Sequence, residues 1–472
     1  MQIRYGALVL ASILATMSAP SVYGRDAHTG RAKAHLAQDT DTDPQDPEGS
    51  QEGPVVQPPF PGQMPNLPMA GTPTTPQVHS KFTVLMDVNS GQILWSRNPD
   101  AKRSIASTTK ILTAILLMER GKPYDIVTAP PGIDKVEESS LHLTPGETIP
   151  LHDLLYALLL RSANDTAVAG ADYLAGSLPA FADLMNAKAA EIGARNSHFV
   201  TPNGLFNPQH YSTAADMALI ARYAVTNLPE FNEIVKTQRY KVSRSVHKSD
   251  SVVFNTAKTF LKKFPGADGI KTGYIRQAGH CFVGSATRSG WRLIAVALNS
   301  NICRQDVESI LNYGFANFVS VPSVPKGTQE GQVTLPNGEG PVNVVTAKDL
   351  SFVVSRWKPM PQSQVVFTPL ASLPAAPVDP GTKVGTVQVI VNQKVVASVD
   401  AVTQTAVALR PAVIWMRKGR TAGLAMTRWL GAALGATMLL ALAKGIYART
   451  ASKSNGGSGD SIEEEVRGAD NG

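Results

Sequence analysis

Two side chains that could form a nucleophile and its base lie three residues apart at the start of an apolar stretch. Ser107 and Lys110 precede the run from Ile111 to Met118, which predicts a buried helix. Residues three apart share one face of a helix, so the hydroxyl and the amine should lie within hydrogen-bond distance at its positive N-terminal end. A lysine can accept a serine proton if burial or nearby positive charge lowers its pKa. The spacing therefore predicts a serine nucleophile activated by a lysine.

The Ser-x-x-Lys spacing is a weak signal by itself. It recurs from Ser245 to Lys248, in a charged stretch, and from Ser323 to Lys326, among prolines and a glycine. Neither of these opens an apolar helix. The alternative for Ser107 is a serine at a helix N-terminus that only supports backbone amides, so further motifs are needed to decide.

A second polar group lies where one expected helix gives way to the next. Leu151 to Leu160 has helical apolar periodicity and is followed, after Ser162, by a second helical run to Gly176. Ser162 and Asp165 fit a capping box for the second helix. Asn164 is harder to explain by capping, because its amide gains little at a turn unless it binds a polar group. Side chains at such a junction can project into a cleft.

A third polar group is the tripeptide Lys271-Thr272-Gly273, which occurs once in the chain. Two strand-like runs follow it, Cys281 to Thr287 and Trp291 to Leu298, so the tripeptide is expected on an edge strand beside an antiparallel hairpin. There an exposed ammonium and hydroxyl could bind an anionic group, while the glycine lets a substrate approach the backbone. An ordinary turn is the alternative interpretation.

The elements that would position these groups begin near Lys81. Strands are expected at Phe82 to Asp87 and Ile93 to Trp95, and helices at Phe181 to Ile192 and Ala214 to Ala224. His198 and His210 lie between those helices without metal-ligand spacing, so we expect hydrogen-bonded structural histidines and no metal site.

The chain of 472 residues is too long for one core and suggests two folded units with appendages. We expect the first unit at 80–322, and a small all-β domain at 323–411, where short alternating segments are separated by Gly and Pro.

The net charge of +7 suits an anionic cell wall or membrane surface, although solvated surface charge explains it as well, and no nucleic-acid partner is expected. Cys281 and Cys303 could pair after export, and the sequence leaves their state open.

Both ends of the chain predict export and anchoring. Residues 1–24 combine Arg4 with an apolar segment and small residues, as in a signal peptide, and 25–79 has the composition of a disordered linker. Trp429 to Ala443 is apolar but shorter than the roughly 20 residues of a membrane span. We therefore expect an anchor at 412–450 that either spans the membrane or lies in its plane, followed by a disordered tail at 451–472. The protein is expected at the extracytoplasmic face of the cell membrane.

Together the three motifs resemble those of the penicillin-recognising serine enzymes. Ser107-Thr108-Thr109-Lys110, Ser162-Ala163-Asn164 and Lys271-Thr272-Gly273 occur in that order. The surrounding residues are similar to the D-alanyl-D-alanine carboxypeptidases, the low-molecular-mass penicillin-binding proteins, over roughly Lys81 to Tyr447. The resemblance implies an α+β fold, in which a transpeptidase-like domain with an antiparallel sheet flanked by helices precedes the small all-β domain. It also implies release of the terminal D-alanine from peptidoglycan stem peptides and acylation by β-lactams. No cofactor is expected, since the protein supplies every reacting group.

The resemblance further implies a catalytic role for Ser107, Lys110 and Ser162, and counts Tyr274 among the substrate-binding residues. Ser107 would attack the carbonyl between the two D-alanines, and Lys110 would accept its proton. Ser162 would relay a proton toward the leaving D-alanine. The oxyanion would lie between the backbone N–H groups of Ser107 and Tyr274.

Substrate binding is implied for the remaining motif residues. Asn164 would orient the substrate and Lys110, while Lys271 and Thr272 would hold the terminal carboxylate and Gly273 would admit the peptide. Ile275 departs from the family, which often carries threonine there, and this puts the geometry beside the carboxylate in doubt.

A β-lactamase-like enzyme and a slow peptidoglycan-binding or antibiotic-sensing protein are the alternatives to a carboxypeptidase. The first is disfavoured because the stretch from Asn196 to Leu205 lacks the glutamate of class A β-lactamases, and the second because all three motifs are intact.

Overall fold

The computed structural model describes residues 69, 71, 73–137, 139–246 and 251–454. The expected signal peptide, most of the expected linker and residues 455–472 of the expected tail lie outside this part of the chain. The three motifs and the regions around them lie within it.

A five-stranded antiparallel sheet organises the part of the chain that carries the motifs. Its strand order is β2-β1-β9-β8-β7. The strands are β1 (Phe82–Asp87), β2 (Ile93–Arg97), β7 (Ala267–Ile275), β8 (Gly279–Arg288) and β9 (Trp291–Leu298). The expected strands are therefore confirmed, and the Lys-Thr-Gly tripeptide lies on β7 at the edge of the sheet. The strand β1, near the start of this domain, pairs with β9, near its end. The sheet is therefore complete only when the two ends of the domain have come together.

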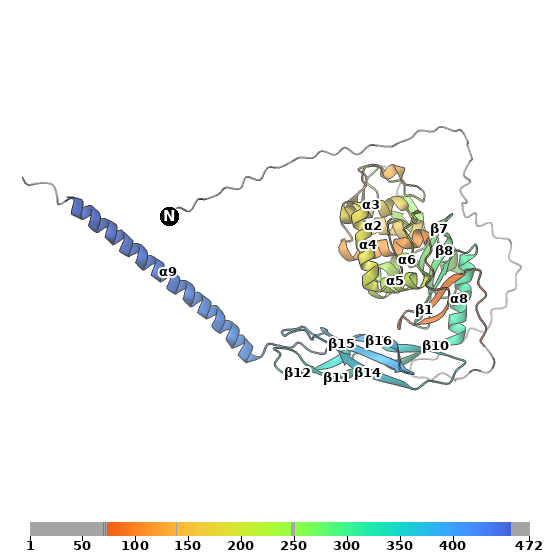
Figure 1. The fold of residues 1–472 in the computed structure, drawn as a ribbon. Coiled ribbons are helices and arrows are strands. Elements are labelled where there is room, and N and C mark those ends of the chain that lie inside the picture. The colour runs from red at the N-terminus through yellow and green to blue at the C-terminus, as the bar shows by residue number, and fades with distance from the viewer. Residues whose placement is uncertain (1–68, 70, 72, 138, 247–250, 455–472) are drawn as a thin grey trace, which may run out of the picture. The chain divides into compact units, whose positions relative to one another are not determined.

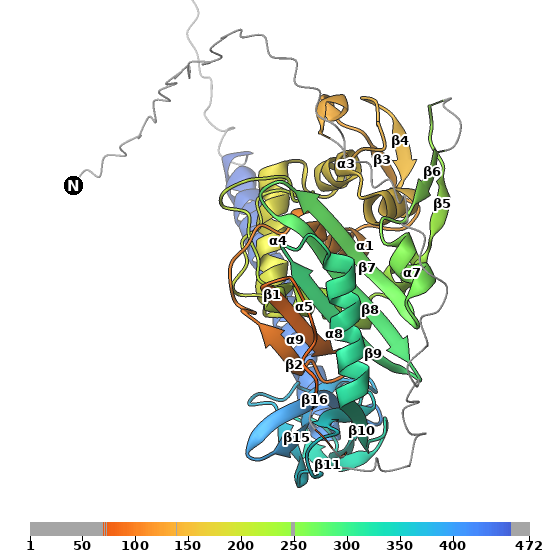
Figure 2. The same ribbon diagram turned by 90° about the vertical axis from the view of Figure 1, so that its right-hand side faces the viewer.

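Helices cover both faces of this sheet (Figure 1). In Figure 2, α8 lies in front of the sheet and α5 behind it, and both helices contact β9. The helices of this domain are α1 (Lys110–Arg120), α2 (Leu151–Tyr156), α3 (Asn164–Ala175), α4 (Leu178–Ile192), α5 (Ala214–Asn227), α6 (Pro229–Lys236), α7 (Lys258–Lys263) and α8 (Cys303–Asn317). Residues Lys110 to Leu117 of α1 are all buried, because this helix is apolar on every side and lies inside the helical layer. The sheet and helices confirm the expected α+β transpeptidase-like fold.

The junction between α2 and α3 differs from the expected capping box. The helix α2 continues into a π-helical turn, η3 (Ala157–Arg161), and Ser162 then adopts a left-handed conformation with φ of 65°. The N-cap of α3 is Ala163, and no side chain caps this helix. The capping interpretation of Ser162 and Asp165 was therefore wrong. The Asp165 carboxylate instead accepts hydrogen bonds from a segment more than twenty residues earlier in the chain.

Two short hairpins flank the helical layer. One pairs β3 (Ile126–Thr128) with β4 (Thr148–Pro150), and the other pairs β5 (Arg239–Val242) with β6 (Ser251–Phe254). The second hairpin contacts α2 and η3, which places it near the Ser162 junction.

A β-rich domain follows α8 and confirms the expected all-β character. The strand β10 (Phe318–Val324) pairs with β13 (Leu350–Ser355). A separate five-stranded sheet has the order β11-β12-β16-β15-β14. Its strands are β11 (Gln329–Thr334), β12 (Pro341–Thr346), β14 (Ser363–Pro369), β15 (Lys383–Val391) and β16 (Lys394–Thr403). Pro322 and Ser323 both lie inside β10, so we place the junction at Phe318 rather than at 323.

The chain then forms one long helix, α9 (Pro411–Ser454). Within the described residues, one helical stretch is long and apolar enough to cross a membrane, the 24 residues from Met426 to Arg449. It is longer than the apolar run from Trp429 to Ala443 because flanking residues continue the same helix. Such a helix is consistent with a C-terminal membrane anchor.

Candidate active site

The nucleophile candidate lies on a tight turn that leads directly into α1. Residues Ala106–Thr109 form a 3₁₀ turn, η1, and Lys110 is the first residue of α1. Lys110 Nζ lies 2.8 Å from Ser107 Oγ. The three-residue spacing therefore brings the amine and the hydroxyl together, as expected.

Lys110 Nζ is completely buried and has three oxygen partners. Besides Ser107 Oγ, it lies 2.7 Å from Asn164 Oδ1 and 2.8 Å from the carbonyl oxygen of Asn203. Burial lowers the pKa of Lys110 well below its ordinary value, the positive charge of Lys271 lowers it further, and Asp165 acts in the opposite direction. These influences favour a neutral amine, the form that can act as a base.

The same geometry fixes where the lone pair of a neutral Lys110 points. A neutral amine has two hydrogens and one lone pair, whereas the oxygens of Asn164 and Asn203 only accept hydrogen bonds. Those two oxygens therefore take the two hydrogens. The lone pair is left facing the third partner, the Ser107 hydroxyl, which can donate its proton to it.

Asn164 presents its oxygen to Lys110 because its nitrogen is already engaged. Asn164 Nδ2 donates to the carbonyl of Glu137 at 3.0 Å, and the Asn164 side chain is buried. Ser162 lies two residues before it and is 8% exposed. No hydrogen-bond partner is present for the Ser162 hydroxyl within the described part of the chain. Its proton is therefore available to a bound substrate.

The Lys-Thr-Gly strand runs directly alongside the nucleophile turn. A Cβ atom on Gly273 would lie 2.8 Å from the backbone nitrogen of Ser107, so only glycine allows this approach. The backbone of β7 therefore contacts η1 immediately before Tyr274. Tyr274 is 57% exposed, and its ring packs against His280 with 4.4 Å between ring centroids.

Lys271 is buried, whereas the sequence predicted an exposed ammonium. It is only 1% exposed, because η1, α6 and α7 all pack against β7. Burial lowers the pKa of Lys271 to about 7. Its Nζ donates to the Thr272 carbonyl at 2.8 Å, and the Thr272 hydroxyl donates to Thr256 Oγ1 at 2.7 Å. No direct hydrogen bond joins Lys271 or Ser162 to Ser107 or Lys110 among the described residues.

A turn at 201–205 contributes to the site although its residues carry no catalytic signature. Asn203 supplies the carbonyl that binds Lys110, and Gly204 has a positive φ of 81°. A Cβ atom on Gly204 would lie 2.0 Å from the carbonyl oxygen of Ala106. The turn therefore packs directly against the nucleophile turn. The Asn-Gly pair in the sequence signals a turn, but it does not reveal what the turn contacts.

His210 fastens the same turn through a defined tautomer. Its Nδ1 accepts hydrogen bonds from the backbone N–H groups of Val200 and Thr201, so the proton lies on Nε2. Nε2 lies 2.9 Å from Thr109 Oγ1, which itself donates to the carbonyl of Ala106. Burial lowers the pKa of His210 to about 4, and nearby His198 contributes to this shift. Within the described residues, no group of three or more His, Cys, Asp or Glu side chains could hold a metal ion.

Two stretches of the chain match families of known proteins. Residues 69–301 match the family described as "D-alanyl-D-alanine carboxypeptidase". Residues 318–409 match the family described as "Penicillin-binding protein 5, C-terminal domain". The first match ends just before α8 begins and the second begins where β10 begins, so α8 lies between the two matched stretches.

Similar proteins include the D-alanyl-D-alanine carboxypeptidases DacC of Escherichia coli and DacF of Bacillus subtilis. DacC is 31% identical over 68% of this chain and 83% of its own length. DacF is 29% identical over 65% of this chain and 80% of its own length. These alignments cover most of each relative and therefore extend beyond one shared motif.

Solved structures show the same architecture. The crystal structure of penicillin-binding protein 5 from Haemophilus influenzae aligns with a TM-score of 0.56 and 29% identity, over 71% of this chain and 99% of that chain. The D-alanyl-D-alanine carboxypeptidase DacD from Francisella tularensis has the same fold, with a TM-score of 0.53 over 73% of this chain and 98% of that chain. The chain therefore belongs to the D-alanyl-D-alanine carboxypeptidases and is a serine peptidase of the penicillin-binding protein 5 type.

Proposed function

We propose that this carboxypeptidase removes the terminal D-alanine from peptidoglycan stem pentapeptides through an acyl-enzyme on Ser107. The observation that carries the proposal is the set of three oxygens around Lys110 Nζ. Two of them take the amine hydrogens, and the third belongs to the Ser107 hydroxyl. A buried neutral lysine in this arrangement is a general base aimed at a serine nucleophile.

In the acylation step, Ser107 Oγ bonds to the carbonyl carbon between the two D-alanines while its proton passes to Lys110 Nζ. The carbonyl oxygen becomes an oxyanion, which the backbone N–H groups of Ser107 and Tyr274 would bind. The carbon–nitrogen bond then breaks. The Ser162 hydroxyl, which has no competing partner in the described structure, would turn toward Lys110 and relay its proton to the departing amine, and D-alanine leaves.

Deacylation repeats the same steps with water. A water molecule attacks the ester carbonyl and gives its proton to Lys110, after which the bond from carbon to Ser107 Oγ breaks and the serine regains a proton. Asn164 keeps the base aimed in both half-reactions, because its amide oxygen binds one of the Lys110 hydrogens. The shortened peptide is released with a new terminal carboxylate.

Lys271 and Thr272 would bind the carboxylate of the terminal D-alanine. A carboxylate beside the buried Lys271 favours the protonated form of this lysine, so the substrate supplies the negative charge that the free site lacks. Thr272 can turn its hydroxyl from Thr256 to the substrate. β-Lactams, which also carry a carboxylate beside a reactive carbonyl, would acylate Ser107 in the same position.

The C-terminal helix suggests where the reaction takes place. The stretch from Met426 to Arg449 would hold the enzyme at the extracytoplasmic face of the cytoplasmic membrane, where nascent peptidoglycan is accessible. The modest positive charge of the chain suits this anionic surface.

The function is tested by measuring free D-alanine released from a diacetyl-Lys-D-Ala-D-Ala peptide by the full chain in detergent. We expect multiple turnovers that Ser107→Ala abolishes, together with covalent labelling by fluorescent penicillin. Ser323→Ala is a matched control, because Ser323 also stands three residues before a lysine but lies in β10. It should leave both activities unchanged.

The two alternative functions predict other outcomes. Covalent penicillin labelling at Ser107 without any D-alanine release would indicate a slow receptor and contradict the carboxypeptidase mechanism. Rapid hydrolysis of the bound penicillin would indicate a β-lactamase-like enzyme. Release that persists in Ser107→Ala would show that another residue is the nucleophile.

A further inference from the structure

The Asn164 amide is oriented by a segment that precedes it by more than twenty residues. The backbone N–H of Asn164 donates to the carbonyl of Ser139 at 2.6 Å, and its side-chain Nδ2 donates to the carbonyl of Glu137 at 3.0 Å. The first bond fixes the backbone of Asn164, and the second directs Nδ2 away from Lys110, so that the amide oxygen faces the amine. A shift of this segment would therefore release the amide oxygen from its position on the base.

Asp165 holds the following part of this segment, residues 139–143, from the side of α3. Its buried carboxylate accepts hydrogen bonds from Ser140 Oγ at 2.7 Å and from the backbone N–H groups of Leu141 and Leu143, each at 2.9 Å. The 139–143 segment is thus bound to the residue directly after Asn164. Hydrogen bonds to an ionised carboxylate are strong, so these three bonds hold the segment firmly against Asp165.

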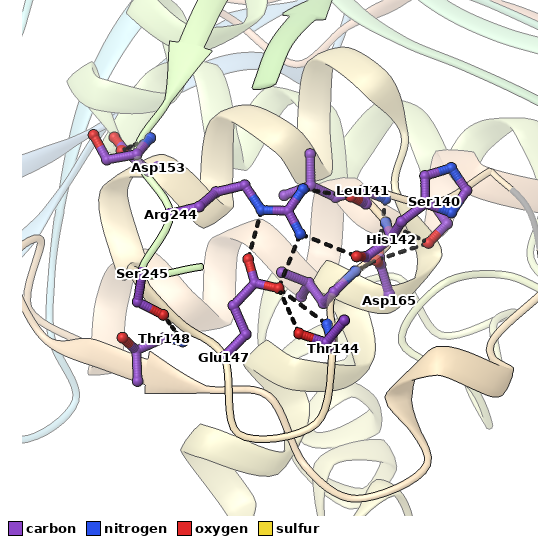
Figure 3. Close-up of polar contacts among 12 residues, drawn as sticks. Ser140, Leu141, His142, Thr144, Glu147, Thr148, Asp153, Asp165, Arg244 and Ser245 are labelled. Carbon is purple, nitrogen blue, oxygen red and sulfur yellow. Dashed lines mark hydrogen bonds and ion pairs between the residues drawn. The ribbon is translucent and has the colours of Figure 1, made fainter. Parts of the chain in front are cut away.

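Arg244 holds the same segment from the opposite side (Figure 3). It follows β5 and donates to the carbonyl oxygens of Leu141 and His142, each at 3.0 Å. Its guanidinium also pairs with Glu147, with 2.9 Å between Nη2 and Oε2. The Glu147 carboxylate in turn accepts a hydrogen bond from the backbone N–H of Thr144.

This ion pair lies in the interior rather than on the surface. The side chains of Arg244 and Glu147 are 4% and 0% exposed. Burial raises the pKa of Glu147, but hydrogen bonds from Arg244 and Thr144 outweigh this effect, and its pKa lies below the ordinary value. A buried pair is costly to desolvate and adds little net stability, so its effect here is on the geometry of the segment that it contacts.

We propose that Arg244 is a positioning residue for the reaction. Its hydrogen bonds hold the 139–143 segment against α3, and this keeps the Asn164 amide oxygen directed at Lys110. The inference rests on the proposed function, because it requires Asn164 to orient the base. Only a guanidinium can serve here, since its planar fork binds a carboxylate and two carbonyls at once. A lysine would keep the charge but lose this geometry.

A double-mutant cycle with Arg244→Lys and Asn164→Ala tests the inference. The readout is the rate constant for covalent labelling by fluorescent penicillin, per mole of folded enzyme. We expect Arg244→Lys to slow labelling about tenfold, within the range of coupling through packed networks. In the Asn164→Ala background the same substitution should have no further effect, because the residue it positions is gone.

The same hairpin offers a matched control. Tyr240 on β5 donates to Asp153 at 2.8 Å, so Tyr240→Phe removes a hydrogen bond that holds the hairpin but leaves the contacts of Arg244 in place. This variant should label at the wild-type rate. Hydrogen exchange of the 139–147 amides should increase in Arg244→Lys and stay unchanged in Tyr240→Phe.

Three results would overturn the inference. The first is an equal slowing by Arg244→Lys with and without Asn164, and the second is an equal slowing by Tyr240→Phe. The third applies if Arg244→Lys does not fold: Glu147→Gln then replaces it, and a wild-type labelling rate together with increased exchange at 139–147 would contradict the inference. The proposed function fails separately, if wild-type enzyme is labelled but releases no D-alanine.

Discussion

Two buried lysines, to which the proposed mechanism gives different tasks, lie within electrostatic range of each other. Lys110 has a pKa far below its ordinary value because of burial and because of the charge of Lys271. Lys271 has a pKa of about 7, for which burial is the cause. In the proposed mechanism the first must be neutral to accept a proton, whereas the second must be protonated to bind a carboxylate. The repulsion between them favours this division, because a proton on Lys271 disfavours one on Lys110.

The need for a neutral Lys110 and a protonated Lys271 predicts a pH optimum for kcat/KM. The pH dependence of kcat/KM reflects the pKa values of these groups in the free enzyme. Activity should rise with pH as Lys110 loses its proton and fall above about pH 7 as Lys271 loses its own. Lys271→Arg should move the falling limb to higher pH, because a guanidinium stays protonated. The measurement is D-alanine release at limiting substrate across the pH range. An unchanged falling limb in Lys271→Arg would show that another group controls it.

At the scale of elements, three segments meet at the nucleophile turn. The turn η1 contacts β7 at Gly273 and the 201–205 turn at Gly204, and in both places the backbones approach too closely for a side chain. His210 then ties the 201–205 turn to Thr109. The position of Ser107 is therefore set by backbone contacts on both sides of it.

Gly204→Ala tests the closest of these contacts. The added Cβ would lie 2.0 Å from the carbonyl oxygen of Ala106, so the turn and its Asn203 carbonyl must move. Penicillin labelling should slow about 100-fold, the order expected for a displacement of about 1 Å at a reacting group. Gly193→Ala is the control, since Gly193 has a φ of 95° with nothing within 4 Å of the added atom. Equal labelling rates in the two variants would refute the role of this contact.

His210 predicts how stability depends on pH. Its pKa is about 4 in the folded protein and 6.5 in the unfolded chain, so between these values the unfolded chain binds the extra proton. The free energy of unfolding should therefore decrease as the pH is lowered from about 6.5 to about 4, by about 3 kcal/mol in total from this residue. Urea unfolding at several pH values should show a smaller decrease for His210→Gln than for wild type. A decrease of the same size in both would mean that other groups cause it.

At the scale of the whole molecule, the proposed chemistry lies in the domain that precedes the β-rich domain and α9. All the residues proposed for the reaction lie between Ser107 and Tyr274, before β10 begins. The side chains from Met426 to Arg449 are exposed to the surroundings, as expected of a helix whose environment is lipid.

Ending the chain after Arg410 should separate location from catalysis. Without α9, the protein is expected to leave the membrane fraction, because the largely apolar 24-residue stretch that would hold it there is gone. Its kcat/KM on a soluble D-Ala-D-Ala peptide should stay within about twofold of the full chain, since α9 supplies none of the proposed reacting groups. Fractionation and D-alanine release measure the two properties. A truncated protein that still sediments with membranes would contradict the anchor.

The sequence by itself determined the features that depend on neighbours along the chain. Strands β1, β2, β8 and β9 follow from short strand-like runs joined by turn residues, and the contact between Ser107 and Lys110 follows from a three-residue spacing. The all-β domain was likewise visible from its short alternating segments. Motif order indicated the penicillin-recognising serine enzymes, and the residues around the motifs indicated the carboxypeptidases, because both depend only on residue types and their order in the chain.

Only the tertiary structure decided what these residues contact across the fold. It buried Lys271, and it made the Asp165 carboxylate accept hydrogen bonds from the 139–143 segment instead of capping a helix. It also brought the Asn203 carbonyl to Lys110 across 93 residues of chain. It also paired Arg244 with Glu147 across 97 residues. Local pattern cannot supply such contacts, because they form only when separate segments pack together and each buried polar group must find a partner there.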